Sequence, residues 1–494
     1  MPMFSGGMEI EVKMKKRKIL IAMLSVFIAV FPTACGNPDS SESGNKKPLA
    51  SFGNLWEMKA GESDGKADIL LKEIRSSGNI TPAGTVYYLS ADGSDKNSGT
   101  DESNPWKSVK MLKDTVFEAG DTVLFRRGDT FRGDFTLQSG VTYGTYGTGD
   151  KPMIYGSKKN LADAKWETTY INNVYVCDEF YAKDVGLLVF ENGKAVGIKR
   201  SGVSDLKENY DFCYDVETRQ IKLYCDFGNP SDLFESIEAG MNQTIINGTN
   251  ISDVTIDGLS IRYGGAHGIG IGNSSNITIR NCEVGWVGGS YQLKTVRYGN
   301  CIEFWENARN NTVENCYLYQ AYDTGLTNQY IGEPEQPVTV DNLTYCNNLI
   351  EYCTMSYEFF LDDNKFPQQS IIKNVTFSNN ILRYCGYGWG KQRPDVSAVS
   401  HLKSDRICRS QNFLIQNNIF DRSAGYMLNF QAPESESVYP QIEGNTYIQP
   451  LDARFAKWNS DEKISFGDGV AEIMKQRGID SNPTVVYCER ESED

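Results

Sequence analysis

Six short segments of this chain repeat one pattern, and that repetition restricts the fold more than any other feature. Each has a β-branched or aromatic residue two positions before a shared Asn or Gly, and an apolar residue three positions after it. The shared positions are Gly258, Asn281, Asn315, Asn347, Asn379 and Asn417. Units this short cannot bury a hydrophobic face alone, but stacked units bury one continuous core.

The composition of each unit favours strands over helices. The segments between the shared positions are rich in β-prone residues and show no helical period. Such units fit successive coils of a parallel β-helix, in which equivalent residues stack about 4.8 Å apart. The Asn column then predicts a hydrogen-bonded ladder at a bend. The expected class is therefore all-β.

The repeat also divides the chain. Residues 85–156 read as an N-terminal cap and first coils, with a short amphipathic helix over 108–119 covering the open edge. Residues 157–240 interrupt the repeat with strand-like runs and an Asn192–Gly193 turn, which indicates an inserted small β-module. The main β-helix is expected over 241–450. Residues 451–494 hold one helix, about 469–477, and form a C-terminal cap.

The N-terminus reads as an export signal. A basic cluster at 13–18 precedes an apolar run of 13 residues, 19–31, too short to span a bilayer comfortably. The following Pro-Thr-Ala-Cys35-Gly resembles a bacterial lipoprotein signal, which implies lipidation of Cys35; an ordinary signal peptide that contains Cys is the alternative. Residues 1–35 would be the signal and 36–84 a tether and N-terminal segment. We expect a protein anchored by lipid to the extracytoplasmic face of the cell membrane.

The amino-acid composition restricts the binding partners and cofactors to be expected. With 49 Lys and Arg against 64 Asp and Glu, the net charge is −15, which repels phosphate and argues against nucleic acid. Most of the 12 Cys are expected to be small buried side chains, with one bridge among Cys177, Cys213 and Cys225 left open. The chain has no phosphate-binding Gly loop, CxxC pair or His cluster with metal-ligand spacing, so we expect no cofactor and no metal. We also expect a monomer.

Three N-terminal motifs carry a family resemblance. The segments 88–95, 127–133 and 143–149 resemble the N-terminal part of right-handed parallel β-helix proteins of the pectate-lyase-like superfamily. The inserted module makes the chain most similar to the β-xylosidase-like glycoside hydrolases, over about residues 85–450. The resemblance implies a right-handed coil that acts on carbohydrate, although a fold alone does not determine chemistry.

Four later strands offer candidate site residues. If Phe304, Leu326, Leu361 and Leu402 form one inward column, their neighbours face outward, because side chains alternate along a strand. The outward set then contains four carboxylates, two aromatic residues and two basic or titratable residues: Glu303, Asp323, Glu358, Asp362, Trp305, Phe360, His401 and Lys403.

Asp323 and Glu358 are the expected catalytic pair, with roles unassigned. On adjacent coils they would lie one strand spacing apart, and two carboxyl groups about 5 Å apart are the retaining glycosidase arrangement. The other residues of the set would bind substrate, as would His267 in its Gly-rich segment, with Trp305 and Phe360 stacking on sugar rings. Taken singly, an outward acid on so acidic a chain is more often only solvated.

These residues support three functions. The first is a retaining, cell-surface glycoside hydrolase acting on a polysaccharide or oligosaccharide. The second is a pectate-type lyase, with Lys403, His401 or Arg406 as base and Ca²⁺ held by Asp362 and Asp363. The third is a non-catalytic glycan-binding or adhesive β-helix.

Overall fold

The computed structural model describes residues 58–292, 296–394, 398–404, 409–431, 439–459 and 462–490. The signal peptide, most of the tether and Cys35 lie outside these ranges, as does Arg406. None of the helices in these ranges is long and apolar enough to cross a membrane. All described residues belong to one compact unit, Lys47–Asp494.

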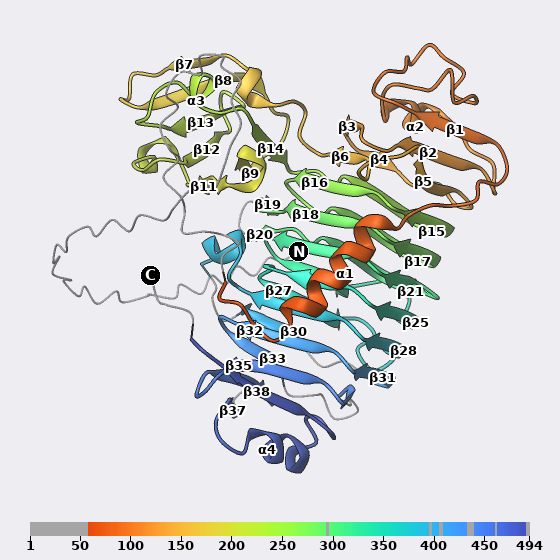
Figure 1. Cartoon of the computed structure of the whole chain (residues 1–494), viewed down its shortest axis with the longest axis vertical. Coiled ribbons are helices and arrows are strands. Elements are labelled where there is room, and N and C mark those ends of the chain that lie inside the picture. The colour runs from red at the N-terminus through yellow and green to blue at the C-terminus, as the bar shows by residue number, and fades with distance from the viewer. Residues whose placement is uncertain are drawn as a thin grey trace, which may run out of the picture. The chain divides into compact units, whose positions relative to one another are not determined.

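The chain is a parallel β-helix, as predicted (Figure 1). Three strands make one coil, so β24, β25 and β26 are followed in register by β27, β28 and β29 and then by β30, β31 and β32. The larger sheet, 18-stranded over the described ranges, contains β1 (Val86–Leu89), β2 (Thr122–Arg126), β4 (Phe135–Thr136), β5 (Thr142–Tyr146), β15 (Ile246–Asp257), β17 (Ile269–Arg280), β21 (Ile302–Arg309), β22 (Thr312–Glu314), β24 (Thr324–Gly332), β25 (Thr339–Cys346), β27 (Met355–Asp363), β28 (Ile371–Ser378), β30 (Ser400–Ser404), β31 (Ser410–Gln416), β33 (Tyr426–Phe430), β34 (Gln441–Glu443), β36 (Arg454–Trp458) and β37 (Glu462–Ser465). The second sheet, 10-stranded over the same ranges, contains β3 (Thr130–Arg132), β6 (Met153–Tyr155), β16 (Ser260–Gly264), β18 (Glu283–Val287), β23 (Tyr317–Ala321), β26 (Leu349–Glu351), β29 (Ile381–Cys385), β32 (Ile419–Ser423), β35 (Thr446–Pro450) and β38 (Thr484–Cys488).

The two apolar columns of the repeat form the core of the coil. All their members are fully buried and pair in register from coil to coil, which confirms the alignment read from the sequence. The first column is Ile256, Ile279, Val313, Tyr345, Phe377 and Ile415, and the second is Ile261, Val284, Leu318, Ile350, Leu382 and Phe420.

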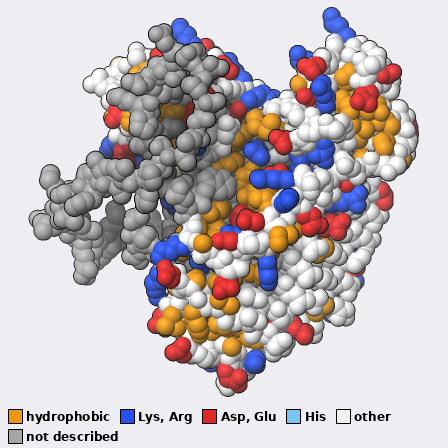
Figure 2. Space-filling view, viewed as in Figure 1, with side chains coloured by type: hydrophobic (Ala, Val, Ile, Leu, Met, Phe, Trp, Pro, Cys, Tyr) orange, Lys and Arg blue, Asp and Glu red, His pale blue; other side chains and the backbone are white. Residues whose placement is uncertain are grey.

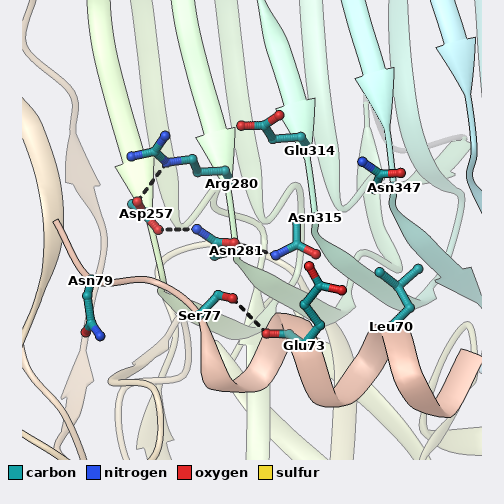
Figure 3. Close-up of a pocket in the computed structure, with 10 residues that line it drawn as sticks. All are labelled: Leu70, Glu73, Ser77, Asn79, Asp257, Arg280, Asn281, Glu314, Asn315 and Asn347. Carbon is teal, nitrogen blue, oxygen red and sulfur yellow. Dashed lines mark hydrogen bonds and ion pairs between the residues drawn. The ribbon is translucent and has the colours of Figure 1, made fainter.

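The shared Asn column marks a left-handed turn in every coil. Asn281 and Asn315 have φ of 54° and 51°, and Gly258 has φ of 81°, a region that Gly and Asn enter at least cost. Asn315 Nδ2 donates to Asn281 Oδ1 at 2.5 Å, and Asn281 Nδ2 donates to Asp257 Oδ1 at 2.7 Å (Figure 3). The expected ladder therefore exists at this end of the column.

A second, buried Asn ladder lies one residue further along the chain. Asn348 Nδ2 donates to Asn380 Oδ1, and Asn380 Nδ2 donates to Asn418 Oδ1, both at 3.0 Å. Asn418 repeats this with Asn445 at 2.9 Å. All four side chains are fully buried or nearly so, and backbone carbonyls accept their remaining amide protons.

Helix α1 (Asp64–Ser76) covers the outer face of the 10-stranded sheet and lies in the segment 36–84, which was expected to be a tether and N-terminal segment. Ala67 and Ile74 are buried in a cluster of aromatic and aliphatic side chains, most of them from that sheet and others from residues 187–196 and η4 (Trp389–Gln392). Asp64 Oδ1 pairs with Arg383 Nη2 at 2.6 Å. Figure 1 shows α1 lying across these strands, and Figure 2 shows basic and acidic side chains next to one another on the same face of the molecule.

The two ends of the coil carry short helices. Helix α2 (Lys110–Asp114) lies inside the expected 108–119 helix but is shorter, and its capping role stays a prediction. Helix α4 (Val470–Arg477) begins after Gly469 and ends before Gly478, close to the expected bounds.

Residues 157–240 form two small sheets with a core of their own. Their elements are η1 (Leu161–Asp163), β7 (Trp166–Thr168), β8 (Val174–Phe180), β9 (Val185–Phe190), η2 (Glu191–Gly193), β10 (Ala195–Val196), β11 (Ile198–Lys199), η3 (Val203–Asp205), β12 (Asp211–Asp215), β13 (Gln220–Tyr224), α3 (Pro230–Leu233) and β14 (Ile237–Met241). Strands β9 and β10 are antiparallel and joined at the expected Asn192–Gly193 turn. Cys177, Cys213 and Cys225 are free thiols, so no bridge joins any two of them.

Two further elements interrupt the coil. The hairpin of β19 (Ser290–Gln292) and β20 (Val296–Tyr298) follows β18, and the short helix η4 (Trp389–Gln392) follows β29.

Candidate active site

One cavity of about 320 Å³ brings together most of the residues singled out in the sequence. It is lined by both expected catalytic carboxylates and by five of the seven expected substrate-binding residues: Asp323, Glu358, Glu303, Trp305, Phe360, Lys403 and His267. The hairpin adds Gln292, Val296 and Tyr298, the coil adds Asn300, Gln329, Ile331 and Met355, and the segment after η4 adds Arg393.

The strand register differs from the expected one. Phe304 pairs with Asn328 rather than Leu326, and Leu361 pairs with Tyr330. Leu326 and Leu402 do share a column, through Tyr357. The slips are of two and four residues, and an even slip keeps each side chain on its face. The expected columns were therefore wrong, yet most of the outward set still lines the cavity, with His401 and Asp362 as the exceptions.

The observed column alternates carboxylates with other polar residues. Glu303 pairs with Thr327, Thr327 with Glu358, and Glu358 with Lys403, on the successive strands β21, β24, β27 and β30. Asp323 immediately precedes β24, the strand next to Glu358. The register thus places three carboxylates over three neighbouring coils.

Glu303 is held by three polar side chains. Its Oε2 accepts from Asn300 Nδ2 at 2.7 Å and from Gln329 Nε2 at 2.9 Å, and its Oε1 lies 3.4 Å from His267 Nε2. His267 Nδ1 accepts the Asn300 backbone N–H at 3.2 Å, which leaves the ring proton on Nε2, facing Glu303. Glu303 is 7% exposed, so this cradle fixes a largely buried carboxylate at the cavity wall.

Asp323 and Glu358 each pair with a cation. Arg393 Nη1 lies 2.6 Å from Asp323 Oδ1, and Lys403 Nζ lies 3.2 Å from Glu358 Oε1. The Thr324 hydroxyl lies 3.4 Å from Glu358 Oε2. Each catalytic candidate is thus oriented by a cation that is distant from it in the sequence.

The apolar part of the lining suits a sugar ring. Trp305 is partly buried against the core, and its ring lies 5.5 Å from that of Tyr330. Tyr298 meets His267 edge-on at 5.1 Å between ring centres. Aromatic faces beside carboxylates are able to stack on the C–H faces of a pyranose while the acids reach its oxygens.

Two expected site residues lie elsewhere. His401 was expected to face outward, but it is fully buried, with Nδ1 2.9 Å from Ser356 Oγ and its ring against Phe420 of the core. Asp362 lies near the end of β27, in register with Ile331, and does not line the cavity.

The described residues contain no group of three or more His, Cys, Asp or Glu side chains arranged to hold a metal ion. Asp363, a Ca²⁺ ligand in the lyase hypothesis, accepts the backbone N–H groups of Lys365 and Phe366 and the hydroxyl of Ser370. Its oxygens thus stabilise the loop after β27.

Sequence reasoning missed five polar residues of the cavity: Gln292, Tyr298, Asn300, Gln329 and Arg393. Asn300 precedes β21, and Gln329 lies two residues beyond Thr327 on β24, so a correct register would have found Gln329. Arg393 follows η4, and Tyr298 belongs to the hairpin, both outside the repeat. No periodic signal marks those two.

The fold and the repeats define a right-handed parallel β-helix protein: residues 234–390 match the family described as "Right handed beta helix region". A stretch of 207 residues is 27% identical to the lacto-N-biosidase of Bifidobacterium longum subsp. longum. That match covers 38% of this chain and spans 12% of the length of the lacto-N-biosidase.

Three solved structures are similar to this chain at low identity. A complex of XylC with xylose matches at 12% identity with a TM-score of 0.43, over 75% of this chain and 70% of that one. The GH136 lacto-N-biosidase from Eubacterium ramulus matches at 12% identity with a TM-score of 0.41, over 82% of this chain and 68% of that one. Pectate lyase Pel9A matches at 12% identity with a TM-score of 0.41, over 78% of this chain and 76% of that one. At these levels none of them bears on the activity of this chain.

Proposed function

We propose that this chain is a carbohydrate-active enzyme, specifically a glycoside hydrolase that uses Asp323 and Glu358. The observation that carries the proposal is one cavity lined by three mostly buried carboxylates and by Trp305 and Phe360. The sequence similarity to a lacto-N-biosidase supports the same class of reaction.

Both carboxylates pair with a cation, Asp323 with Arg393 and Glu358 with Lys403. The proposal therefore leaves open which of the two is the nucleophile and which is the general acid and base. Asp323 lies four residues before Thr327, the register partner of Glu358, so the strand spacing does not set the separation of the two carboxyl groups. The retaining mechanism is part of the proposal, and the anomeric configuration of the first product tests it.

The test is activity on a panel of aryl glycosides, oligosaccharides and polysaccharides, with Asp323→Asn and Glu358→Gln variants. Each should lower kcat by about 10³-fold or more, whereas Asp341→Asn, on β25 outside the cavity, should leave it unchanged. Nuclear magnetic resonance should show that the product first released has the same anomeric configuration as the substrate. Cleavage at the wild-type rate by both variants would refute this assignment, and binding without turnover by the wild type would leave the adhesive alternative.

The lyase alternative has one observation in its favour, since Lys403 and Arg393 line the same cavity. It predicts an unsaturated uronate product, detected by its ultraviolet absorbance, and loss of that product when a chelator removes Ca²⁺. His401 is too buried to serve as the base.

We also propose, from the sequence alone, that Cys35 carries a lipid anchor. Wild-type protein should then partition with membranes, and Cys35→Ala should release it. Equal partitioning of both would leave an ordinary signal peptide as the better interpretation.

A further inference from the structure

The inserted module contacts one wall of the cavity. That wall is the hairpin of β19 and β20, which contributes Gln292, Val296 and Tyr298 to the lining. Figure 1 shows the hairpin next to β9 of the module. Because the module is an insertion, its contacts with the site are not required by the coil itself.

Asp184, which directly precedes β9, holds the start of the hairpin. Its Oδ2 accepts the backbone N–H of Tyr291 at 2.7 Å. Its backbone carbonyl accepts from the Asn242 N–H at 2.7 Å. Asn242 in turn donates from Nδ2 to the Tyr291 carbonyl at 2.9 Å and accepts from the Tyr298 hydroxyl at 2.8 Å. Both strands of the hairpin are thus tied to residues next to the module.

Lys199 of β11 completes this connection. Its side chain is 3% exposed, with Nζ 2.5 Å from both carboxylate oxygens of Asp184 and 4.6 Å from the centre of the Tyr291 ring. The Lys199 backbone N–H donates to Gln392 Oε1 at 3.4 Å, and Gln392 Nε2 donates to the Gly197 carbonyl at 2.8 Å. Gln392 precedes Arg393, the partner of Asp323. The module therefore touches both non-repeating walls of the cavity.

We propose that Lys199 and Asp184 are positioning residues that set the affinity of the cavity for its sugar. Their ion pair fixes the hairpin, and the hairpin contacts a sugar unit of an oligosaccharide substrate through Gln292, Val296 and Tyr298. The proposal rests on the proposed hydrolase function. Neither residue lines the cavity, so each acts through the hairpin and not on the reacting atoms.

The pair should respond to pH. Burial lowers the pKa of Lys199 to about 8, against the opposing effect of Asp184. The other groups that face Lys199 are the Cys213 thiol, the Tyr291 ring and Arg297 of β20, whose charge lowers the pKa further. Burial raises the pKa of Cys213 to about 11, so that thiol stays neutral in this range. As the pH rises through about 8, Lys199 loses its charge and the hairpin loses its ion pair.

The kinetic test compares KM and kcat of the wild type, Lys199→Met and Lys199→Arg on an oligosaccharide that the enzyme cleaves, from pH 6.5 to 9. Lys199→Met should raise KM about tenfold with kcat within about twofold. Wild-type KM should rise above pH 8, and Lys199→Arg should keep the low KM without that rise. Lys222→Met removes a 2.5 Å ion pair with Asp215 in the same module and should change neither constant. Unchanged KM in Lys199→Met, or the same KM increase in Lys222→Met, would overturn the proposal.

Amide hydrogen exchange provides a readout that needs no substrate. At pH 7 the Tyr291 amide, which donates to Asp184, should exchange faster in Lys199→Met than in the wild type, Lys199→Arg or Lys222→Met. If no glycoside is cleaved, the proposed function fails, yet this measurement still decides whether the ion pair holds the hairpin. Equal Tyr291 exchange in all four proteins would refute the positioning role.

Discussion

At the scale of single residues, every carboxylate of the cavity depends on a partner that is distant in sequence. His267 precedes Glu303 by more than one coil, Lys403 follows Glu358 by one coil, and Arg393 reaches Asp323 from outside the repeat. The carboxylates could be predicted from the sequence because they alternate with core residues along the strands. Arg393, the partner of Asp323, could not be predicted in this way, since it follows an irregular loop.

His401 should make the fold sensitive to acid. Burial lowers the pKa of His401 to about 4, below the value near 6.5 expected in the unfolded chain. The neutral ring therefore stabilises the fold fully above pH 6.5, and this contribution is lost as the pH falls toward 4. Between pH 7 and pH 5 the loss should be about 2 kcal/mol. Urea unfolding at both pH values measures it.

The matched variant is His401→Gln, which removes the titrating ring. Its free energy of unfolding should depend less on pH over the same interval, by about 2 kcal/mol. An identical pH dependence in the variant and the wild type would show that His401 does not titrate as its burial requires.

At the scale of elements, the sequence predicted the repeat better than the register. The core columns around the Asn turn were right because each coil repeats the same motif there. The strands that carry the site lack that motif, and the loops between them differ in length, so Phe304 and Leu361 were placed two and four residues out of register. The alternation of side chains along a strand was enough to predict which residues face outward. Most of the expected cavity residues were therefore predicted correctly in spite of the wrong register.

The buried Asn ladder should contribute more to the free energy of unfolding than an exposed one. Asn380→Ala leaves the backbone N–H and Nδ2 of Asn348 without their acceptor and removes the donor to the Tyr345 carbonyl. The expected cost is about 3 kcal/mol, measured by urea unfolding. The control is Asn374→Gly, because Asn374 is exposed, has φ of 53° and tolerates Gly. A cost below about 1 kcal/mol for Asn380→Ala would show that water or neighbouring groups replace the ladder.

Helix α1 should stabilise the 10-stranded sheet through one apolar face. Ile74 is fully buried in the aromatic cluster, whereas Ile69 of the same helix is 71% exposed. Ile74→Ala should lower the free energy of unfolding by about 2–4 kcal/mol, and Ile69→Ala by less than about 0.5 kcal/mol. Equal effects in urea unfolding would mean that α1 detaches before the coil unfolds.

At the scale of the whole molecule, net charge separates the two enzymatic hypotheses. A net charge of −15 repels a polyuronate at a distance. The two cations of the cavity, Arg393 and Lys403, are each paired with a carboxylate. A neutral glycan experiences none of this repulsion. The charge of the molecule therefore favours neutral substrates, consistent with a hydrolase.

This argument predicts how affinity depends on salt. The Debye length falls from about 10 Å at 0.1 M salt to about 3 Å at 1 M, so salt screens the repulsion of a charged chain and leaves a neutral one unaffected. For a neutral oligosaccharide, KM should stay constant within about twofold over this range. A polygalacturonate should bind more weakly at low salt and more tightly as salt is added. Tight, salt-weakened binding of the polyuronate would instead mean that Arg393 and Lys403 recognise uronate carboxylates, and the lyase hypothesis would then replace the hydrolase.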